Sequence, residues 1–332
     1  MARLSGTVVK VVGGKSLVAS GGRTYSCDLR ARLFRRQGVR LAVGDRVDLE
    51  VPEPAAQEPA AEPAAEPAPL EAVIEAVIEA VQPRKSALRR VRDFKRDQVL
   101  VANLERVFVV VAADDPPYKR PFIDRLIVAC ERDGLEPFLV FNKLDLAGAD
   151  YGQFVDSDAE IYRRLGYQAL LVSASDGRGL AALRAAFVGR ISAVVGPSGV
   201  GKSTLLNAIC PGLTLRTGEV SESDGRGKHT TTSAELIVVP GVEDGFVVDT
   251  PGLRGFGLWD LQPADVAAGY RDVADLAGGC KFRDCMHRGE PECAVKAAAA
   301  AGELDEERYE SYLRLVEELE SAPQNTRASR RR

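Results

Sequence analysis

The sequence contains no long apolar run: no stretch reaches the roughly 18 consecutive uncharged apolar residues that a membrane-spanning helix requires. Its first residues lead directly into a strand-like segment and lack the apolar core of a signal peptide. Cysteine and histidine are scarce, with six and two residues respectively. These absences predict a cytoplasmic protein with no membrane contact, in which the cysteines are reduced thiols or metal ligands rather than disulfides.

The composition is that of a globular protein, because 45% of the residues are apolar and 28% are charged. The 332 residues suffice for two or three domains, each with a hydrophobic core of its own. A formal net charge of −4 does not by itself indicate a nucleic-acid partner. The charge is nevertheless segregated along the chain, since basic residues crowd residues 30–40 and 84–96.

The N-terminal part, residues 1–51, contains short strand-like segments separated by glycine-rich turns, which predicts a small β-barrel. A Pro/Ala/Glu stretch follows at residues 52–69, without any aromatic or β-branched residue. Such a segment cannot bury enough surface to offset its loss of conformational entropy, so we expect a disordered acidic insertion. Residues 72–79 fit a helix, because Ala and Glu favour helices, or a last barrel strand, because small and apolar residues alternate there. We favour the strand.

From residue 107 onward, apolar strand candidates alternate with helical segments. This alternation predicts an α/β domain whose mostly parallel sheet is covered by helices on both faces. After residue 260 the strand pattern stops, and we expect a mostly helical C-terminal part with helices over 265–276 and 303–320. The expected strands are 107–113, 138–141, 169–172, 191–195, 236–239 and 246–248, and the expected helices among them include 122–132, 181–187 and 203–209.

A phosphate-binding loop of the form G-x4-G-K-S spans residues 196–203, between an expected strand and an expected helix. Its glycines let backbone N–H groups surround phosphates at the positive end of the helix. Lys202 is expected to neutralise the β- and γ-phosphates, and the Ser203 hydroxyl to ligate Mg²⁺. The predicted phosphate-binding residues are Gly196, Pro197, Ser198, Gly199, Val200, Gly201, Lys202, Ser203 and Thr204.

The segment Asn142-Lys143-Leu144-Asp145 predicts that the base is guanine. The Asp145 carboxylate can accept hydrogen bonds from the ring N–H and the exocyclic amine of guanine, whereas adenine does not present this pair of donors. Asn142 is expected to hold the loop, and the stem of Lys143 to cover the ring. Ser173 and Ala174, after the next strand, are expected to offer a backbone N–H to the guanine oxygen. Read alone, residues 142–145 also fit an ordinary turn.

The order of these motifs is unusual, because the guanine-reading segment precedes the phosphate loop, whereas ordinary GTPases have the reverse order. Since both motifs are complete, the inversion predicts a circularly permuted GTPase domain. Asp249-Thr250-Pro251-Gly252 follows an expected strand and fits the remaining phosphate sensor. Asp249 is expected to reach Mg²⁺ through water, and the Gly252 N–H to contact the γ-phosphate. The polar segment 217–233 predicts a mobile loop in which Thr231 or Thr232 completes the Mg²⁺ shell.

Residue 253, directly after this motif, is leucine, although many GTPases place a glutamine there to orient the attacking water. Leucine cannot orient water, so we expect slow intrinsic hydrolysis that depends on a partner. His229 lies in the polar segment and is the best internal candidate for the catalytic residue that positions the water. The alternative interpretation makes His229 an ordinary solvated loop residue.

A metal site is predicted by three cysteines and one histidine that cluster within fourteen residues, Cys280, Cys285, His287 and Cys293. Three thiolates and an imidazole form the ligand set of a closed, structural zinc site. The spacing is not that of a common zinc finger, so unrelated reduced cysteines remain an alternative. An iron–sulfur cluster is less favoured, because a histidine takes the place of one thiolate.

Taken together, these motifs resemble the RsgA (YjeQ) family of ribosome small subunit-dependent GTPases. The resemblance extends to the metal cluster, to Asn103, to residues 83–86 and to the segment Gly225-Arg226-Gly227-Lys228-His229-Thr230-Thr231-Thr232. It implies an N-terminal OB-fold that binds rRNA, residues 1–92, a permuted GTPase domain, residues 93–262, and a zinc-binding domain, residues 263–332. It also implies a role in late maturation of the bacterial small ribosomal subunit, stimulation by that subunit, and a catalytic role for His229. The insertion 52–69 departs from the family pattern.

The expected ligands and partners are therefore GTP or GDP with Mg²⁺, one structural Zn²⁺, and the small ribosomal subunit with its rRNA, bound by a monomer. A permuted GTPase for large-subunit assembly is one alternative. An RNA-binding scaffold that uses GTP only for structure is another, because Leu253 weakens the case for catalysis. An ATP-dependent kinase is disfavoured by residues 142–145.

Overall fold

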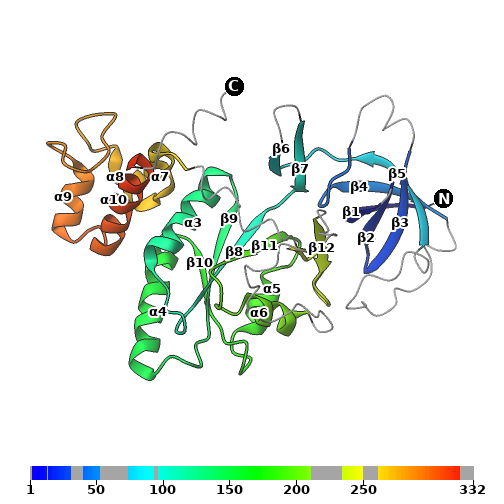
Figure 1. Cartoon of the computed structure of the whole chain (residues 1–332), viewed down its shortest axis with the longest axis horizontal. Coiled ribbons are helices and arrows are strands. Elements are labelled where there is room, and N and C mark those ends of the chain that lie inside the picture. Colours follow the sequence, from blue (N-terminus) through cyan, green and yellow to red (C-terminus); the bar gives the residue numbers. More distant parts are fainter. Residues whose placement is uncertain are drawn as a thin grey trace, which may run out of the picture.

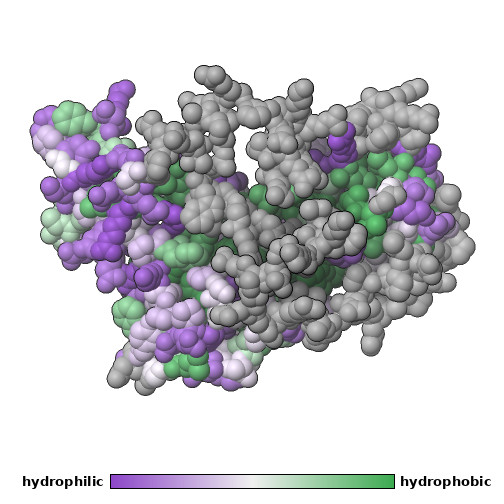
Figure 2. Space-filling view, viewed as in Figure 1, coloured by the Kyte–Doolittle hydropathy of each residue, from purple (hydrophilic) through white to green (hydrophobic). Residues whose placement is uncertain are grey.

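The computed structural model describes residues 2–12, 14–30, 40–52, 74–92, 96–210, 234–249 and 261–321. Along the chain it contains an N-terminal barrel, a central α/β part and a C-terminal group of helices (Figure 1). Figure 2 shows hydrophilic side chains over much of the C-terminal helices on this face. Among the described residues, we find no helix with both the length and the apolar character that crossing a membrane requires.

The N-terminal part is a closed five-stranded barrel with the order β1-β2-β3-β5-β4. Strands β3 and β5 pair in parallel, and the other pairs are antiparallel. This is the OB-fold arrangement, as expected. Ala76 and Ile78 are buried in the barrel, which confirms the strand interpretation of this segment. The strands are β1 (Ala2–Val12), β2 (Lys15–Ser20), β3 (Arg23–Leu29), β4 (Arg46–Val51) and β5 (Ile74–Val81).

A hairpin that the sequence did not predict joins the barrel to the central part. Its strands β6 (Ala87–Arg92) and β7 (Arg96–Ala102) form a separate two-stranded sheet. The domain boundary that we expect at residue 92 falls between these two strands. We missed the hairpin because its first strand is rich in arginine and does not show a clear apolar alternation.

Polar groups fasten the barrel to the end of this hairpin. The Asn103 side chain donates to the Gly44 carbonyl (2.9 Å) and accepts from the Lys85 N–H (2.8 Å). Arg84 forms two hydrogen bonds, of 2.6 and 2.8 Å, with the fully buried carboxylate of Asp45. Gly44 has a φ of +89°, and a Cβ there would lie 2.0 Å from the Ala102 oxygen. Only glycine therefore fits this close approach.

The central part contains a six-stranded sheet with the order β10-β9-β8-β11-β13-β12. All neighbouring pairs are parallel except β12 with β13, so the prediction of a mostly parallel sheet is confirmed. The edge strand β12 follows β13 in space but precedes it in the chain. The strands are β8 (Arg106–Ala112), β9 (Glu136–Asn142), β10 (Gln168–Leu171), β11 (Ile191–Val195), β12 (Glu235–Val238) and β13 (Phe246–Asp249).

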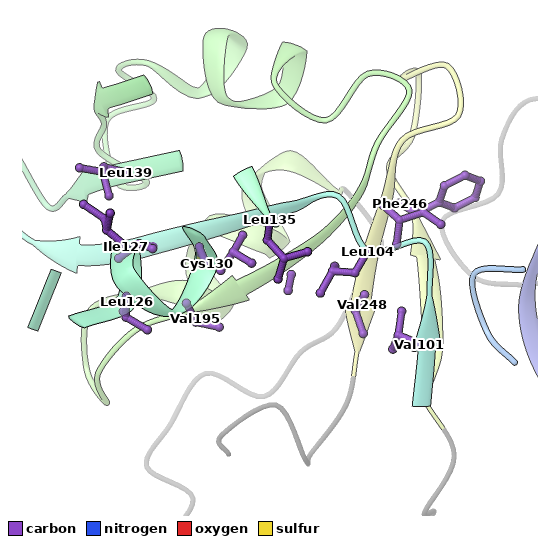
Figure 3. Packing of buried hydrophobic residues seen from close by; sticks show 14 of the residues in the cluster. Val101, Leu104, Leu126, Ile127, Cys130, Leu135, Leu139, Val195, Phe246 and Val248 are labelled. Carbon is purple, nitrogen blue, oxygen red and sulfur yellow. The ribbon is translucent and has the colours of Figure 1, made fainter. Parts of the chain in front are cut away.

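Helices cover both faces of this sheet, as predicted. One face packs on α3 and α4 through residues such as Ile127 and Val155, and the other packs on α5 and α6 through Leu183 and Leu205. Figure 3 shows the first of these clusters, in which Ile127 and Leu139 lie at one end and Leu104, Val248 and Val101 at the other. The helices are α3 (Arg120–Arg132), α4 (Ala149–Arg164), α5 (Leu180–Ala185) and α6 (Lys202–Ile209).

The C-terminal part is helical, and residues 261–321 contain no strand. The single helix expected over 265–276 is instead two short helices, because Tyr270 has an extended backbone (φ −88°, ψ 98°). These helices and the last one pack on α3 through an apolar cluster that includes Val128 and Tyr312. The helices are α7 (Pro263–Gly269), α8 (Arg271–Ala277), α9 (Ala294–Ala301) and α10 (Glu306–Ser321).

Candidate nucleotide and metal sites

The predicted nucleotide residues follow the carboxyl ends of parallel strands, and these ends lie at one edge of the sheet. Strand β9 ends at Asn142, and Gly196 comes directly after β11. Strand β8 lies between β9 and β11, and Ser173 follows β10 after one intervening residue. Ligands of open α/β sheets bind outside the carboxyl ends of the strands. The topology therefore brings together segments that are distant in the sequence.

One side-chain amide joins three of the predicted motifs. Asn142 is 1% exposed, and its Nδ2 donates to the Val200 carbonyl of the phosphate loop (2.8 Å). Its Oδ1 accepts from the Ala174 N–H (3.3 Å). Gly201 passes so close, with a φ of +88°, that a Cβ there would lie 2.5 Å from Asn142 Nδ2. The guanine-reading segment, the Ser-Ala segment and the phosphate loop are thus in direct contact.

The carboxylate of Asp145, which is predicted to recognise guanine, is exposed and is oriented by serines. Ser173 Oγ donates to Asp145 Oδ1 (2.7 Å) and lies 2.9 Å from Ser175 Oγ. Hydrogen bonds from Ser175 and Ser173 lower the pKa of Asp145 below its usual value. The carboxylate is therefore an ionised acceptor at neutral pH, which is the form that pairs with two guanine donors.

Lys143 and Lys202 both hold their ammonium groups against backbone carbonyls. Lys143 has a φ of +60°, and its Nζ donates to the Asp115 carbonyl in the loop after β8. Lys202 Nζ donates to the carbonyls of Gly196 (3.0 Å) and Pro197 (2.6 Å), so it folds over the phosphate loop. Lys202 is also the first residue of α6, and Ser203 and Thr204 follow in the first turn of that helix. Cationic and N–H groups thus gather where an anion would bind.

Several predicted residues lie outside the part of the chain that the structure describes: His229, Thr231, Thr232 and Gly252. For Asp249 only the backbone is described, at the end of β13 and in register with Glu235 of β12. The described geometry therefore concerns residues 142–145 and the phosphate loop. The roles of the residues named above remain predictions.

The four predicted metal ligands converge, because their ligand atoms all lie within 4.8 Å of one another. Cys280 Sγ lies 3.4 Å from His287 Nδ1 and 3.9 Å from Cys293 Sγ, and Cys293 Sγ lies 3.5 Å from the same nitrogen. Tetrahedral bonds of about 2.3 Å to sulfur and about 2.0 Å to nitrogen place neighbouring ligand atoms roughly 3.5–3.8 Å apart. The cluster therefore has the dimensions of a tetrahedral metal site and could hold one ion.

The surroundings of the cluster favour the ligating forms of two of these side chains. Burial lowers the pKa of His287, which keeps the imidazole neutral at neutral pH. Burial acts to raise the pKa of the Cys280 thiol, but hydrogen bonds from the N–H groups of Val295 and Ala294 and from the thiols of Cys293 and Cys285 together lower that pKa. A neutral imidazole and a thiolate are the forms that bind a metal.

Two tyrosines of the last helix support the cluster. Tyr309 Oη donates to the His287 carbonyl (2.6 Å), and Tyr312 Oη donates to the Met286 carbonyl (3.0 Å). Helix α10 is thereby fastened to the ligand loop. A helical apolar stripe does not reveal where a tyrosine hydroxyl points, so the sequence carried no signal for these contacts.

Comparison with family models matches residues 81–259, more than half of the chain, to the model described as RsgA GTPase. The small ribosomal subunit biogenesis GTPase RsgA of Moorella thermoacetica is 40% identical over 316 residues, which cover 95% of this chain and 97% of the relative. The protein of the same name from Chlorobaculum parvum is 38% identical over 320 residues, covering 96% of this chain and 98% of the relative.

Two solved structures also match this chain over almost its whole length. The crystal structure of YjeQ from Thermotoga maritima has a TM-score of 0.72 and 35% identity, and the match covers 97% of this chain and all of the other. The structure of YloQ, described as a circularly permuted GTPase, has a TM-score of 0.71 and 26% identity, with 97% and 96% of the two chains covered.

Proposed function

Because the chain belongs to the RsgA GTPase family and is therefore a GTP-hydrolysing enzyme, we propose that the small ribosomal subunit stimulates its hydrolysis of GTP during maturation of that subunit. The name of the relatives supports this role. The observation that carries the nucleotide part is the Asn142 amide, which joins the base-reading and phosphate-binding segments in one site.

In this site Asp145 accepts from the ring N–H and exocyclic amine of guanine, and the Ala174 N–H, which donates to Asn142 Oδ1 at 3.3 Å, is shared with the guanine oxygen. The aliphatic stem of Lys143 covers the base. Residues 196–204 bind the phosphates through backbone N–H groups, and the Lys202 ammonium exchanges its present carbonyl partners for phosphate oxygens. A charged phosphate is a stronger partner for an ammonium than a neutral carbonyl, so GTP readily displaces these contacts.

Magnesium suits the phosphate end of the site, because the metal ligands predicted there are hydroxyl and carboxylate oxygens. Ser203, in the first turn of α6, would ligate the ion directly, together with Thr231 or Thr232. Asp249 would hold it through water. The ion would neutralise charge that develops on the phosphates during transfer. His229 then serves as the catalytic residue that positions the attacking water, and Gly252 offers its N–H to the γ-phosphate.

The outer domains supply the contacts with the ribosome. We assign residues 1–92 to an rRNA-binding OB-fold, residues 93–262 to the GTPase domain and residues 263–332 to a zinc-binding domain. Zn²⁺ suits the three thiolates and one imidazole, because four soft or borderline ligands at tetrahedral spacing leave no open position for a substrate. The protein acts as a monomer in the cytoplasm, where small subunits are assembled.

The deciding experiment measures GTP hydrolysis by the purified protein alone, with small subunits and with large subunits. We expect stimulation by the small subunit only. Stimulation by the large subunit instead would support a role in large-subunit assembly. Binding of GTP without hydrolysis in any mixture, checked under single-turnover conditions, would support the RNA-binding scaffold.

A further inference from the structure

The edge strand of the central sheet, β12, lies against the barrel and pairs with β13, which ends at a predicted residue of the nucleotide site. Strand β13 ends at Asp249, which begins the Asp-Thr-Pro-Gly motif. Its antiparallel partner β12 places Glu235 in register with Asp249, and β12 is the edge strand of the sheet formed by the described residues. Strand β11 pairs with β13 only at Phe246 and Val247. The backbone of Asp249 is therefore held by β12, through the pairing of Asp249 with Glu235.

The barrel contacts this edge strand directly. Strand β1 lies against β12, and Lys10 Nζ forms an ion pair of 2.7 Å with a Glu235 carboxylate oxygen. Both side chains are about a third exposed, 31% and 29%, so water only partly screens the pair. The lysine thus attaches the barrel to the one residue of β12 that pairs with Asp249.

An irregularity in β1 presents apolar residues to the same edge. The register shifts between Val8 and Lys10, which leaves Val9 as the extra residue of a β-bulge. Val8 belongs to the core of the barrel, whereas Val9 belongs to the cluster of the central sheet that also contains Leu236 and Val248. A bulge re-aims a side chain in this way. Figure 3 shows Val248 beside Leu104, at the end of the cluster that meets the barrel.

From this arrangement we propose that Lys10 is a positioning residue for GTP hydrolysis, which acts through Glu235 and β12 on Asp249. The inference rests on the proposed function, because it takes Asp249 to be a Mg²⁺-binding group. A ligand that shifts the barrel pulls on β12 through the Lys10 ion pair and the Val9 contact. The barrel thereby adjusts the Mg²⁺ site without touching the nucleotide.

Charge reversal separates this role from a general effect on folding. Lys10→Glu and Glu235→Lys each place like charges together, and the double variant restores an ion pair of opposite orientation. The matched control is Lys15→Glu, because Lys15 pairs with Glu75 entirely within the barrel at 3.1 Å. For each protein we would measure kcat, the KM for GTP and the Mg²⁺ concentration at half-maximal rate, with and without small subunits. We would also measure amide hydrogen exchange along β12 and β13 without nucleotide, which should accelerate in both single variants but not in Lys15→Glu.

We expect each single variant to lower kcat roughly five-fold and to raise the Mg²⁺ requirement, in keeping with the strength of a partly exposed ion pair. The KM for GTP should remain unchanged, and the double variant should recover at least half of the loss. Lys15→Glu should behave as wild type. Equal effects of Lys10→Glu and Lys15→Glu, or no recovery in the double variant, would overturn the inference.

The two levels of the hypothesis fail in different ways. If small subunits do not stimulate the wild-type protein, the proposed function fails, yet the Mg²⁺ dependence of intrinsic hydrolysis still tests the Lys10 pair. If wild type is stimulated and both single variants keep its Mg²⁺ dependence, the proposed function stands and the role of Lys10 is refuted.

Discussion

Arg308 of the last helix and Asp124 of α3 form an ion pair of 2.6 Å in which both side chains are almost completely buried. Arg308 also binds Asp272 of α8 through two hydrogen bonds, of 2.6 and 2.9 Å. Its guanidinium lies over the ring of Tyr270 as well, 4.9 Å from the centroid. The C-terminal helices are thus attached to the central domain by a buried charge whose partners belong to both parts.

Replacing this arginine should detach the C-terminal helices. Arg308→Met leaves two carboxylates without their cation, and breaking a buried pair in this way typically costs about 3–5 kcal/mol. Amide hydrogen exchange along α10 should therefore accelerate strongly. Arg314→Met is the control, because this exposed arginine pairs along the same helix with Glu310, and its loss should change stability by less than about 0.5 kcal/mol. Equal protection of α10 in the two variants would contradict the prediction.

The choice of base should follow the chemistry of residue 145. Asp145→Asn replaces one of the two acceptor oxygens by an amide NH₂ group, so the hydrogen bond with the exocyclic amine of guanine is lost and two donors face each other, which corresponds to roughly a thousand-fold weaker GTP binding. Xanthine carries a carbonyl in place of the exocyclic amine, and the variant should bind XTP more tightly than wild type does. Competition binding with GTP, XTP and ATP measures both changes. Asp156→Asn, on the exposed side of α4, should bind GTP like wild type, and a variant at residue 145 that retained GTP preference would disprove the assignment.

The close approach at Gly44 predicts an asymmetry between two glycines. Gly44→Ala and Gly14→Ala both force alanine into a left-handed backbone, with φ of +89° and +95° respectively. Only at Gly44 would the new methyl group meet the Ala102 oxygen, since nothing lies within 4 Å at Gly14. We expect Gly44→Ala to cost about 1–3 kcal/mol more in the free energy of unfolding. Urea titration, followed by the fluorescence of a reporter in the barrel, measures this difference. Equal losses of unfolding free energy in the two variants would show that the backbone around Gly44 and Ala102 moves apart to accept the methyl group.

Loss of the metal should loosen the last helix. Cys285→Ser removes a ligand, so the purified protein should lose its bound metal, whereas Cys210→Ser, which changes a buried cysteine outside the cluster, should keep it. Without the ion, the carbonyls of Met286 and His287 no longer hold their positions against Tyr312 and Tyr309, and exchange along α10 should increase. Metal content is measured by atomic emission. A full complement of metal in Cys285→Ser would remove this site from consideration.

Turnover should depend on His229 while binding does not. His229→Ala removes the group that positions water, and stimulated kcat should fall at least about a hundred-fold. The affinity for GTP should stay within two-fold of wild type, because the base and phosphate contacts are unchanged. Lys228→Ala, at the neighbouring position, should retain most of the stimulated rate. Unchanged turnover in His229→Ala would assign the water-positioning role to another group.

The candidate sites were predictable where a local pattern carries the chemistry. Residue type and spacing alone predict the ligands of residues 142–145, of residues 196–203 and of the Cys₃His cluster. The first two segments meet because each follows the carboxyl end of a parallel strand. The Arg308–Asp124 pair was not predictable, because 184 positions separate its members and either residue alone suggests a solvated helix surface. The bulge at Val9 was hidden for a related reason, since a single extra residue changes which face an apolar side chain occupies without altering the composition of its strand.

Strand β8, the first of the central sheet in the chain, lies in its interior between β9 and β11. Along the chain, the segments predicted to recognise guanine, residues 142–145 and 173–174, are synthesised before β11, the strand that leads into the phosphate loop. At that stage the phosphate loop does not yet exist, so nucleotide cannot make its base and phosphate contacts together. Binding of GTP therefore stabilises only the complete domain. A chain that is arrested or truncated before the phosphate loop gains no stability from the nucleotide.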